Sequence, residues 1–201
     1  MGAESHLLAV AASRWAGRTP STDQIKQLEV FHTLLSTEAI KTGSIGPNEA
    51  GRIWSRHIAD SLLFGLAIAE TATCVDIGSG AGLPGLPLAI VYPETAFELV
   101  DRSGRRCDLL RRMIAVLRLE NCTVVHSDID NVDKLYQAVV SRAAIPFHRI
   151  LIHVKRLLDR PGVALIAQSW AGGDDPEVAQ AADGISVLNI DVPVDILDSP
   201  V

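Results

Sequence analysis

Four glycines stand between two short apolar runs in residues 73–101, and this pattern constrains the fold more than any other. The runs predict strands at 74–77 and 97–100, and the loop after the first strand carries the glycines at positions 78, 80, 82 and 85. Glycine lets a backbone approach a ligand closely, because no Cβ atom intervenes and positive φ costs little. Asp101, at the end of the second strand, is placed to accept hydrogen bonds from ribose hydroxyls. The pattern therefore predicts an α/β domain that binds a nucleoside-containing cofactor.

The glycine loop matches two patterns, and its prolines discriminate between them. Residues 80–85 satisfy G-x-G-x-x-G, the dinucleotide fingerprint, so a nicotinamide-dependent oxidoreductase is one alternative. Residues 76–82 instead resemble motif I of S-adenosylmethionine-dependent methyltransferases, whose acid helps to hold the amino-acid end of the cofactor. Pro84 and Pro87 lack N–H donors, so the start of the following helix offers few amides to a pyrophosphate. An adenosyl sulfonium carries no phosphate, and the second pattern is therefore favoured.

Three runs sharpen this resemblance. They are Arg-His-Ile-Ala-Asp-Ser at 56–61, Val-Asp-Ile-Gly-Ser-Gly-Ala-Gly-Leu-Pro-Gly-Leu-Pro-Leu at 75–88 and Val-Ser-Arg-Ala at 140–143. In this order they resemble the GidB (RsmG) family, bacterial methyltransferases that modify N7 of one guanine in small-subunit (16S) ribosomal RNA. The resemblance implies a cytoplasmic, monomeric rRNA (guanine-N7) methyltransferase that uses S-adenosyl-L-methionine. Its partner would be small-subunit ribosomal RNA or a ribosomal particle.

The resemblance implies cofactor-binding roles for eight residues, which are Asp76, Gly78, Gly80, Leu83, Asp101, Ile129, Asp130 and Arg142. Asp76 and the glycine loop would hold the amino-acid end of the cofactor, with Gly80 allowing close approach. Asp101 would bind the ribose, and Ile129 with Asp130 would flank the adenine.

Arg142 is expected at the mouth of the cleft, where it would bridge cofactor and RNA. An ion pair with a local acid is the alternative for a single arginine, and it stays open. His57 and Asp60 also match the family, either as a polar pair at a helix start or as direct substrate contacts.

No metal site is expected, because the histidines and cysteines are dispersed. No catalytic residue is expected either, since guanine N7 has an in-plane lone pair and no proton to remove, and alignment would supply the acceleration.

Beyond residue 73, apolar strands alternate with helices. Strands are predicted at 74–77, 97–100, 123–126, 139–141, 163–167 and 185–192, and helices at 84–91, 104–118, 131–137 and 146–158. Such alternation predicts a mostly parallel sheet with helices on both faces, with ligands beyond the carboxyl ends of the strands. The fold class is thus α/β, a Rossmann-like class I methyltransferase preceded by an N-terminal helical segment.

The sequence of the N-terminal third predicts helices. Ser21 is a candidate N-cap for a helix with one apolar face, which comprises Ile25, Leu28, Phe31, Leu34 and Leu35. Another helix is predicted to begin near Pro47 and to lead into the apolar stretch 61–69. We therefore predict a helical segment at 1–70 packed on a methyltransferase core at 71–201.

Composition and charge are compatible with this interpretation. The chain has 201 residues, 48% of them hydrophobic, and no apolar run long enough to span a bilayer, so no membrane association is expected. Three cysteines without metal or redox spacing are typical of a reducing cytoplasm.

The net charge is −6, but all 18 basic residues lie before residue 161. Six arginines in one predicted helix and its lead-in either neutralise RNA phosphates or form a solvated helix face; they are Arg102, Arg105, Arg106, Arg111, Arg112 and Arg118.

The sequence also departs from the family. Asp128 stands where a basic residue is common, and Gln168 and Ser169 stand where Lys-Gly is usual. Val201 is the last residue, where the closing strand of a seven-stranded methyltransferase sheet is expected to begin. Two alternatives follow: a shortened sequence, or a divergent, catalytically impaired paralogue that binds S-adenosylmethionine and acts by interaction.

Overall fold

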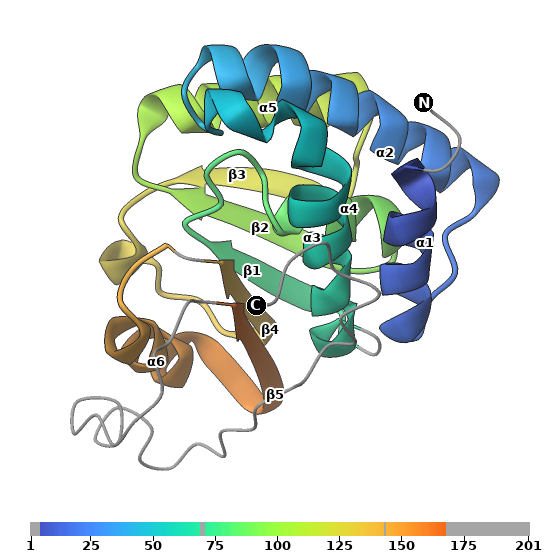
Figure 1. Ribbon diagram of the computed structural model, residues 1–201. Coiled ribbons are helices and arrows are strands. Elements are labelled where there is room, and N and C mark those ends of the chain that lie inside the picture. The colour runs from blue at the N-terminus through green and yellow to red at the C-terminus, as the bar shows by residue number, and fades with distance from the viewer. Residues whose placement is uncertain (1–4, 69–70, 143, 168–201) are drawn as a thin grey trace.

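A five-stranded parallel sheet forms the centre of the computed structural model, which describes residues 5–68, 71–142 and 144–167. The strands have the order β3-β2-β1-β4-β5 (Figure 1). They are β1 (Thr73–Ile77), β2 (Ala96–Asp101), β3 (Cys122–His126), β4 (Tyr136–Arg142) and β5 (Leu158–Ala167). The chain runs outward from β1 to β3 and then returns to β4 on the other side of β1. The carboxyl ends of β1 and β4 therefore form the topological switch point, where α/β sheets bind ligands.

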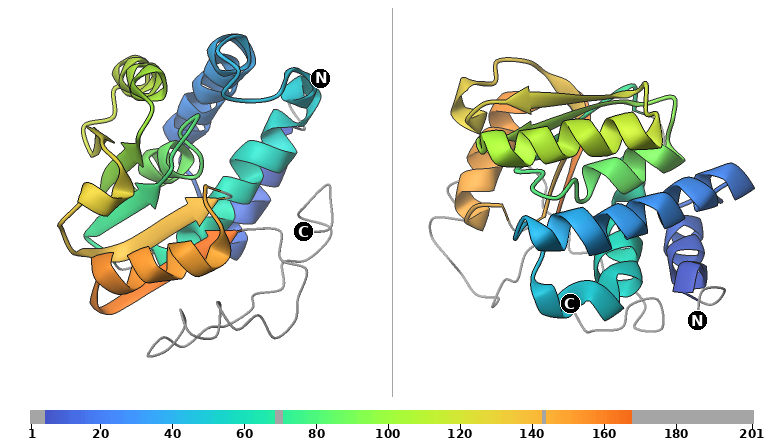
Figure 2. Two further views of the ribbon diagram at one scale, coloured as in Figure 1. Left: turned by 90° about the vertical axis from the view of Figure 1, so that its left-hand side faces the viewer. Right: turned by 90° about the horizontal axis from the view of Figure 1, so that it is seen from above.

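Helices cover both faces of the sheet, as predicted, because side chains alternate between its faces. Cys74, Phe97 and Val140 face the helices α4 (Gly85–Val91) and α5 (Gly104–Leu117). Residues that point to the other face, such as Val75, Val100 and Val139, pack instead on helix α6 (Phe147–Leu157). Figure 2 shows α6 on one side of the sheet and α5 on the other.

The N-terminal residues are helical, as the sequence predicts. The main helices are α1 (Ser5–Trp15), α2 (Thr22–Leu34) and α3 (Asp60–Leu63). Two π-helical stretches, η1 (Leu35–Ala39) and η3 (Ile53–Ala59), and two 3₁₀ stretches, η2 (Pro47–Arg52) and η4 (Phe64–Ala67), complete this part. Among the described residues, none of the helices combines the length and the apolar content needed to cross a bilayer.

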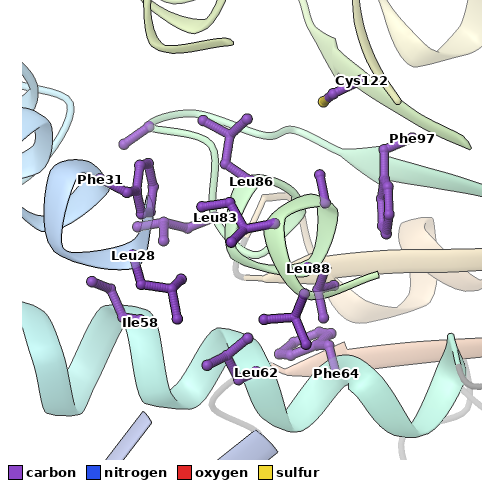
Figure 3. Close-up of a cluster of buried hydrophobic side chains, with 14 of the residues drawn as sticks. Leu28, Phe31, Ile58, Leu62, Phe64, Leu83, Leu86, Leu88, Phe97 and Cys122 are labelled. Atoms are coloured by element: carbon purple, nitrogen blue, oxygen red, sulfur yellow. The ribbon is translucent and has the colours of Figure 1, made fainter. Parts of the chain in front are cut away.

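Helix α2 begins with the predicted cap and buries most of its predicted face. Ser21 Oγ accepts from the N–H of Gln24, whose side chain accepts in turn from the N–H of Ser21, forming a capping box. Leu28 and Phe31 are buried against Leu83 and Leu86 at the start of α4 (Figure 3), while Ile25 is only half-buried. Each such burial contributes about 1.5–3 kcal/mol, so the N-terminal helices and the glycine-loop region are stabilised together.

Most of the predicted strands and helices after residue 73 are confirmed, but the helix at 131–137 is wrong. The chain forms a single 3₁₀ turn, η5 (Ile129–Asn131), and enters β4 at Tyr136. Val132 and Tyr136 have the four-residue spacing of a helix, yet both insert into the cluster beneath the sheet from extended backbone. The phenol of Tyr136 donates to Glu98 Oε2 at 2.7 Å, which ties this strand start to β2. The predicted strand at 185–192 and the positions 168–170 lie outside the described residues.

Candidate cofactor and substrate site

The glycine loop after β1 is bonded to the end of β2. The N–H groups of Gly78 and Ser79 both donate to the carbonyl oxygen of Val100, at 2.9 and 3.1 Å. Gly78 has φ +71°, and a Cβ atom there would lie 2.4 Å from the Cβ of Ala144. A side chain at Gly78 is therefore excluded both by backbone strain and by the segment that follows β4.

Gly80 differs from Gly78 because its surroundings are open. Its φ is +55°, and the nearest atom to an added Cβ would be Gly78 O at 3.8 Å. Open space next to this backbone supports the prediction that a ligand approaches it closely.

Asp101 anchors this loop. Its Oδ2 accepts from the N–H of Gly80 at 3.0 Å, and its Oδ1 accepts from the N–H of Ser103 at 2.8 Å. Arg106 lies 3.7 Å from the same carboxylate, whose side chain is only 3% exposed. Each carboxylate oxygen has a second lone pair, so these bonds leave acceptor capacity for ribose hydroxyls.

Asp76 lies beneath the loop with one oxygen unpaired. Its Oδ2 accepts from the N–H of Gly85 at 3.0 Å, while its fully buried Oδ1 has no hydrogen-bond partner among the described residues. Burial raises the pKa of this carboxyl to about 7, although the Gly85 N–H, the nearby Ser79 hydroxyl and the charge of Arg142 lower it. A buried, half-satisfied carboxylate at this place suits a cationic group such as the ammonium of an amino acid.

Gly85 is absent from the predicted site residues, but the structure gives it a specific role. A Cβ atom there would lie 2.7 Å from Asp76 Oδ2 and 2.3 Å from Leu99 Cδ2. Glycine therefore lets the start of α4 bond to the buried acid. The run 75–88 that resembles the GidB family includes Gly85, but the resemblance gave this glycine no cofactor-binding role.

Leu83 contributes its side chain to the core. It is buried in the cluster of Figure 3, so only its backbone is left for a cofactor contact. The cofactor role of Leu83 stays a prediction.

Ile129 and Asp130 form the η5 turn after β3, which two neighbours hold in place. Asp128 Oδ1 accepts from the N–H of Asp130 at 3.1 Å, so the residue that departs from the family caps the turn. Arg156, on α6, donates to the carbonyl oxygens of Ile129 and Val132. The carboxylate of Asp130 is 64% exposed and lies 3.8 Å from Nε2 of His153. The turn sits at the same sheet edge as the glycine loop.

Arg142, the last residue of β4, is bonded to the N-terminal segment. Its guanidinium donates to the carbonyl oxygen of Arg56 at 3.1 Å and to Nδ1 of His57 at 3.3 Å. Burial lowers the pKa of Arg142, while the negative charges of Asp60 and Asp76 raise it. The structure gives Arg142 no ion pair with a carboxylate among the described residues, so the local ion-pair alternative is not favoured.

Asp60 lies beside this arginine and is half-buried. Burial raises the pKa of its carboxyl to about 6, against the opposing charges of Arg142 and Arg56. No hydrogen bond or ion pair of its carboxylate is found in the described part of the chain.

The sheet edge thus brings Asp76, the glycine loop, Asp101 and Arg142 together. A surface hollow of about 430 Å³ lies at the opposite edge, next to Pro93 and Asn121, and contains none of the predicted site residues.

Four of the six arginines after Asp101 fall into two groups; of the others, Arg106 lies near Asp101 and Arg118 is exposed at the end of α5. Arg111 and Arg112 pair with Asp108 and Glu38, at 3.0 and 3.3 Å. Arg102 and Arg105 are exposed and have no ion pair within the described residues. These two are therefore available to an anionic partner.

The chain is similar to known proteins in sequence and, over part of its length, in structure. A family model described as GidB, rRNA small subunit methyltransferase G, matches residues 24–189. The Ribosomal RNA small subunit methyltransferase G of Chlorobium luteolum is 32% identical over 182 residues, which are 89% of this chain and 75% of the relative. That of Acidothermus cellulolyticus is 39% identical over 131 residues, 65% of this chain, and the match spans only 59% of the relative. The structure of PKMT2 from Rickettsia typhi in complex with AdoHcy is similar with a TM-score of 0.42 and 26% identity, over 47% of this chain and 20% of that one.

Proposed function

Because the chain belongs to the GidB family, that of rRNA small subunit methyltransferase G, we propose that it methylates N7 of a guanine in small-subunit (16S) ribosomal RNA with S-adenosyl-L-methionine. The observation that carries this proposal is the hydrogen bond from the N–H of Gly80 to Asp101, which ties the loop after β1 to the end of β2 beside the switch point of the sheet. The partner is small-subunit ribosomal RNA or a ribosomal particle, and the enzyme acts as a monomer in the cytoplasm.

The residues at the sheet edge fit the cofactor. Asp76 Oδ1, buried and unpaired, offers an acceptor for the ammonium of its amino-acid end. The open space beside Gly80 leaves room for the cofactor to lie close to the backbone of the loop. Asp101 retains lone pairs that can accept hydrogen bonds from the ribose of the cofactor. Ile129 and Asp130 would flank its adenine.

The proposed chemistry asks for positioning rather than proton transfer. S-adenosylmethionine supplies an electrophilic methyl group on a sulfonium, and guanine N7 supplies a lone pair that carries no proton. The residues of this chain therefore need only bind and align the two partners, which is worth about 7–11 kcal/mol in well-oriented reactions. Arg102 and Arg105, exposed directly after Asp101, would neutralise RNA phosphates near the methyl group.

Two variants test the cofactor site by calorimetric titration with S-adenosylhomocysteine. Gly80→Val should abolish binding, because valine disfavours φ +55° and fills the open space beside the loop. Asp101→Ala should also abolish binding. The substitution removes both the acceptor of the Gly80 N–H, which anchors the loop, and the acceptor expected for the ribose hydroxyls. Unchanged affinity in both variants would refute the site.

Methyl incorporation distinguishes the enzyme from its alternative. The wild-type chain should transfer labelled methyl groups to small-subunit RNA or particles that lack the modification. Binding of S-adenosylhomocysteine without any transfer would favour the catalytically impaired paralogue.

A further inference from the structure

The guanidinium of Arg142 is held by the N-terminal segment rather than by the sheet. Its two recorded acceptors, the carbonyl oxygen of Arg56 and Nδ1 of His57, are adjacent residues of the π-helical stretch η3. Arg142 itself ends β4, more than eighty residues later in the chain. The position of this side chain therefore depends on a contact between the helical segment and the core.

The contact fixes the tautomer of His57. An arginine guanidinium has only donors, so Nδ1 must present its lone pair and the ring proton must be on Nε2. Nε2 lies 3.3 Å from Oε2 of Glu49 without the alignment of a hydrogen bond, and the negative charge of this carboxylate favours a proton there. Burial, and next the charge of Arg142, lower the pKa of His57 to about 4, so the ring is neutral near pH 7.

Glu49 is itself oriented by its neighbours. Its Oε1 lies 3.8 Å from Arg56 and 4.0 Å from Arg52, so the carboxylate is shared among three side chains of η2 and η3. Glu49, His57 and Arg142 thus form a chain of contacts from the 3₁₀ stretch η2 to the sheet edge.

Two carboxyl groups attract the same guanidinium without being paired with it among the described residues. The charges of Asp60 and Asp76 act on Arg142, and Oδ1 of Asp76 lacks a partner. If the imidazole acceptor were lost, the guanidinium would turn toward these acids. It would then occupy the acceptor that the cofactor's ammonium needs.

We propose that His57 is a positioning residue that keeps Arg142 directed toward the bound cofactor, with Glu49 holding the imidazole in the required tautomer. This inference rests on the proposed function, in which Arg142 contacts the cofactor. It makes the N-terminal segment a part of the binding site, although all of the predicted cofactor residues come after it.

The test compares two substitutions at His57. His57→Leu removes the acceptor and keeps an apolar side chain of similar size, whereas His57→Asn keeps an oxygen acceptor near the position of Nδ1. We expect His57→Leu to weaken S-adenosylhomocysteine binding about tenfold and to raise KM for the cofactor more than it lowers kcat. His57→Asn should stay within about threefold of wild type. Equal losses in both variants would contradict the acceptor role.

A double-mutant cycle separates positioning from simple structural damage. In the Arg142→Ala background, His57→Leu should have no further effect on binding, because the group that it positions is gone. Additive losses would overturn the inference. His32→Leu serves as the control, since His32 stacks on Trp54 in the same segment and should leave affinity unchanged. A wild-type chain that fails to bind S-adenosylhomocysteine would overturn the proposed function itself, and this inference with it.

Discussion

At the scale of single residues, Asp76 is an acidic side chain held entirely away from water. It is completely buried, and burial raises the pKa of its carboxyl from 3.8 to about 7. The folded protein therefore keeps a proton on this side chain at pH values where the unfolded chain has released it. Asp60, with its pKa raised to about 6, behaves in the same way over a narrower range.

This shift predicts how stability depends on pH. The folded state binds more protons than the unfolded state between pH 3.8 and about 7, so the contribution of Asp76 to the free energy of unfolding falls as the pH rises through this range. Asp76→Asn stays neutral and can still accept from the N–H of Gly85, so its stability should vary less with pH. Urea denaturation of both proteins at several pH values measures this difference. Parallel pH profiles would mean that Asp76 does not titrate in this range.

At the scale of elements, helix α6 holds the turn that is expected to flank the adenine. Arg156 donates to two carbonyl oxygens of the segment between β3 and β4, and this segment has no regular structure beyond the three residues of η5. The helix thus fixes a loop that the sheet alone leaves unsupported.

Arg156→Ala should therefore weaken cofactor binding although this residue is not itself among the expected cofactor contacts. We expect about a threefold to tenfold loss of S-adenosylhomocysteine affinity, because the carbonyl oxygens of Ile129 and Val132 lose their donor. Arg149→Ala, which changes an exposed arginine on the same helix, provides the control. Equal affinities in the two variants would show that the turn holds its shape without Arg156.

The elements also show what could be predicted from sequence. The five strands were found because apolar runs and glycines mark them locally, and helix α2 because its cap and its apolar spacing lie within one window. The prediction of a helix at 131–137 was wrong because Val132 and Tyr136 have helical spacing. Only packing against the neighbouring sheet makes their backbone extended. The partners of Arg142 were missed for a related reason. A contact between residues 86 positions apart leaves no local pattern.

At the scale of the whole molecule, basic residues and the cofactor edge lie together. Arg102 and Arg105 follow β2 directly and are exposed, whereas Arg111 and Arg112, further along α5, are paired with acids. Arg102 and Arg105 therefore place positive charge, unpaired among the described residues, at the start of α5, next to the cofactor edge, despite a net charge of −6.

Replacing both Arg102 and Arg105 with glutamine should weaken binding to ribosomal RNA and reduce its salt dependence. Loss of two phosphate contacts lowers the slope of log K against log salt concentration by about 2. S-adenosylhomocysteine affinity should not change. Arg111→Gln, which removes an arginine already paired with Asp108, should change the slope less. An unaltered slope in the double variant would place the RNA on another face.

The anchoring of α2 has a consequence for how the chain is made. Gln24 donates to the carbonyl oxygens of Ile90 and Val91, and Gln27 donates to that of Leu117, which lies 90 residues later. During synthesis, the apolar face of α2 emerges from the ribosome long before α4 and α5, the helices that cover it. The nascent chain therefore lacks the partners that α4 and α5 provide for Leu28 and Phe31 until residues 85–117 have been translated.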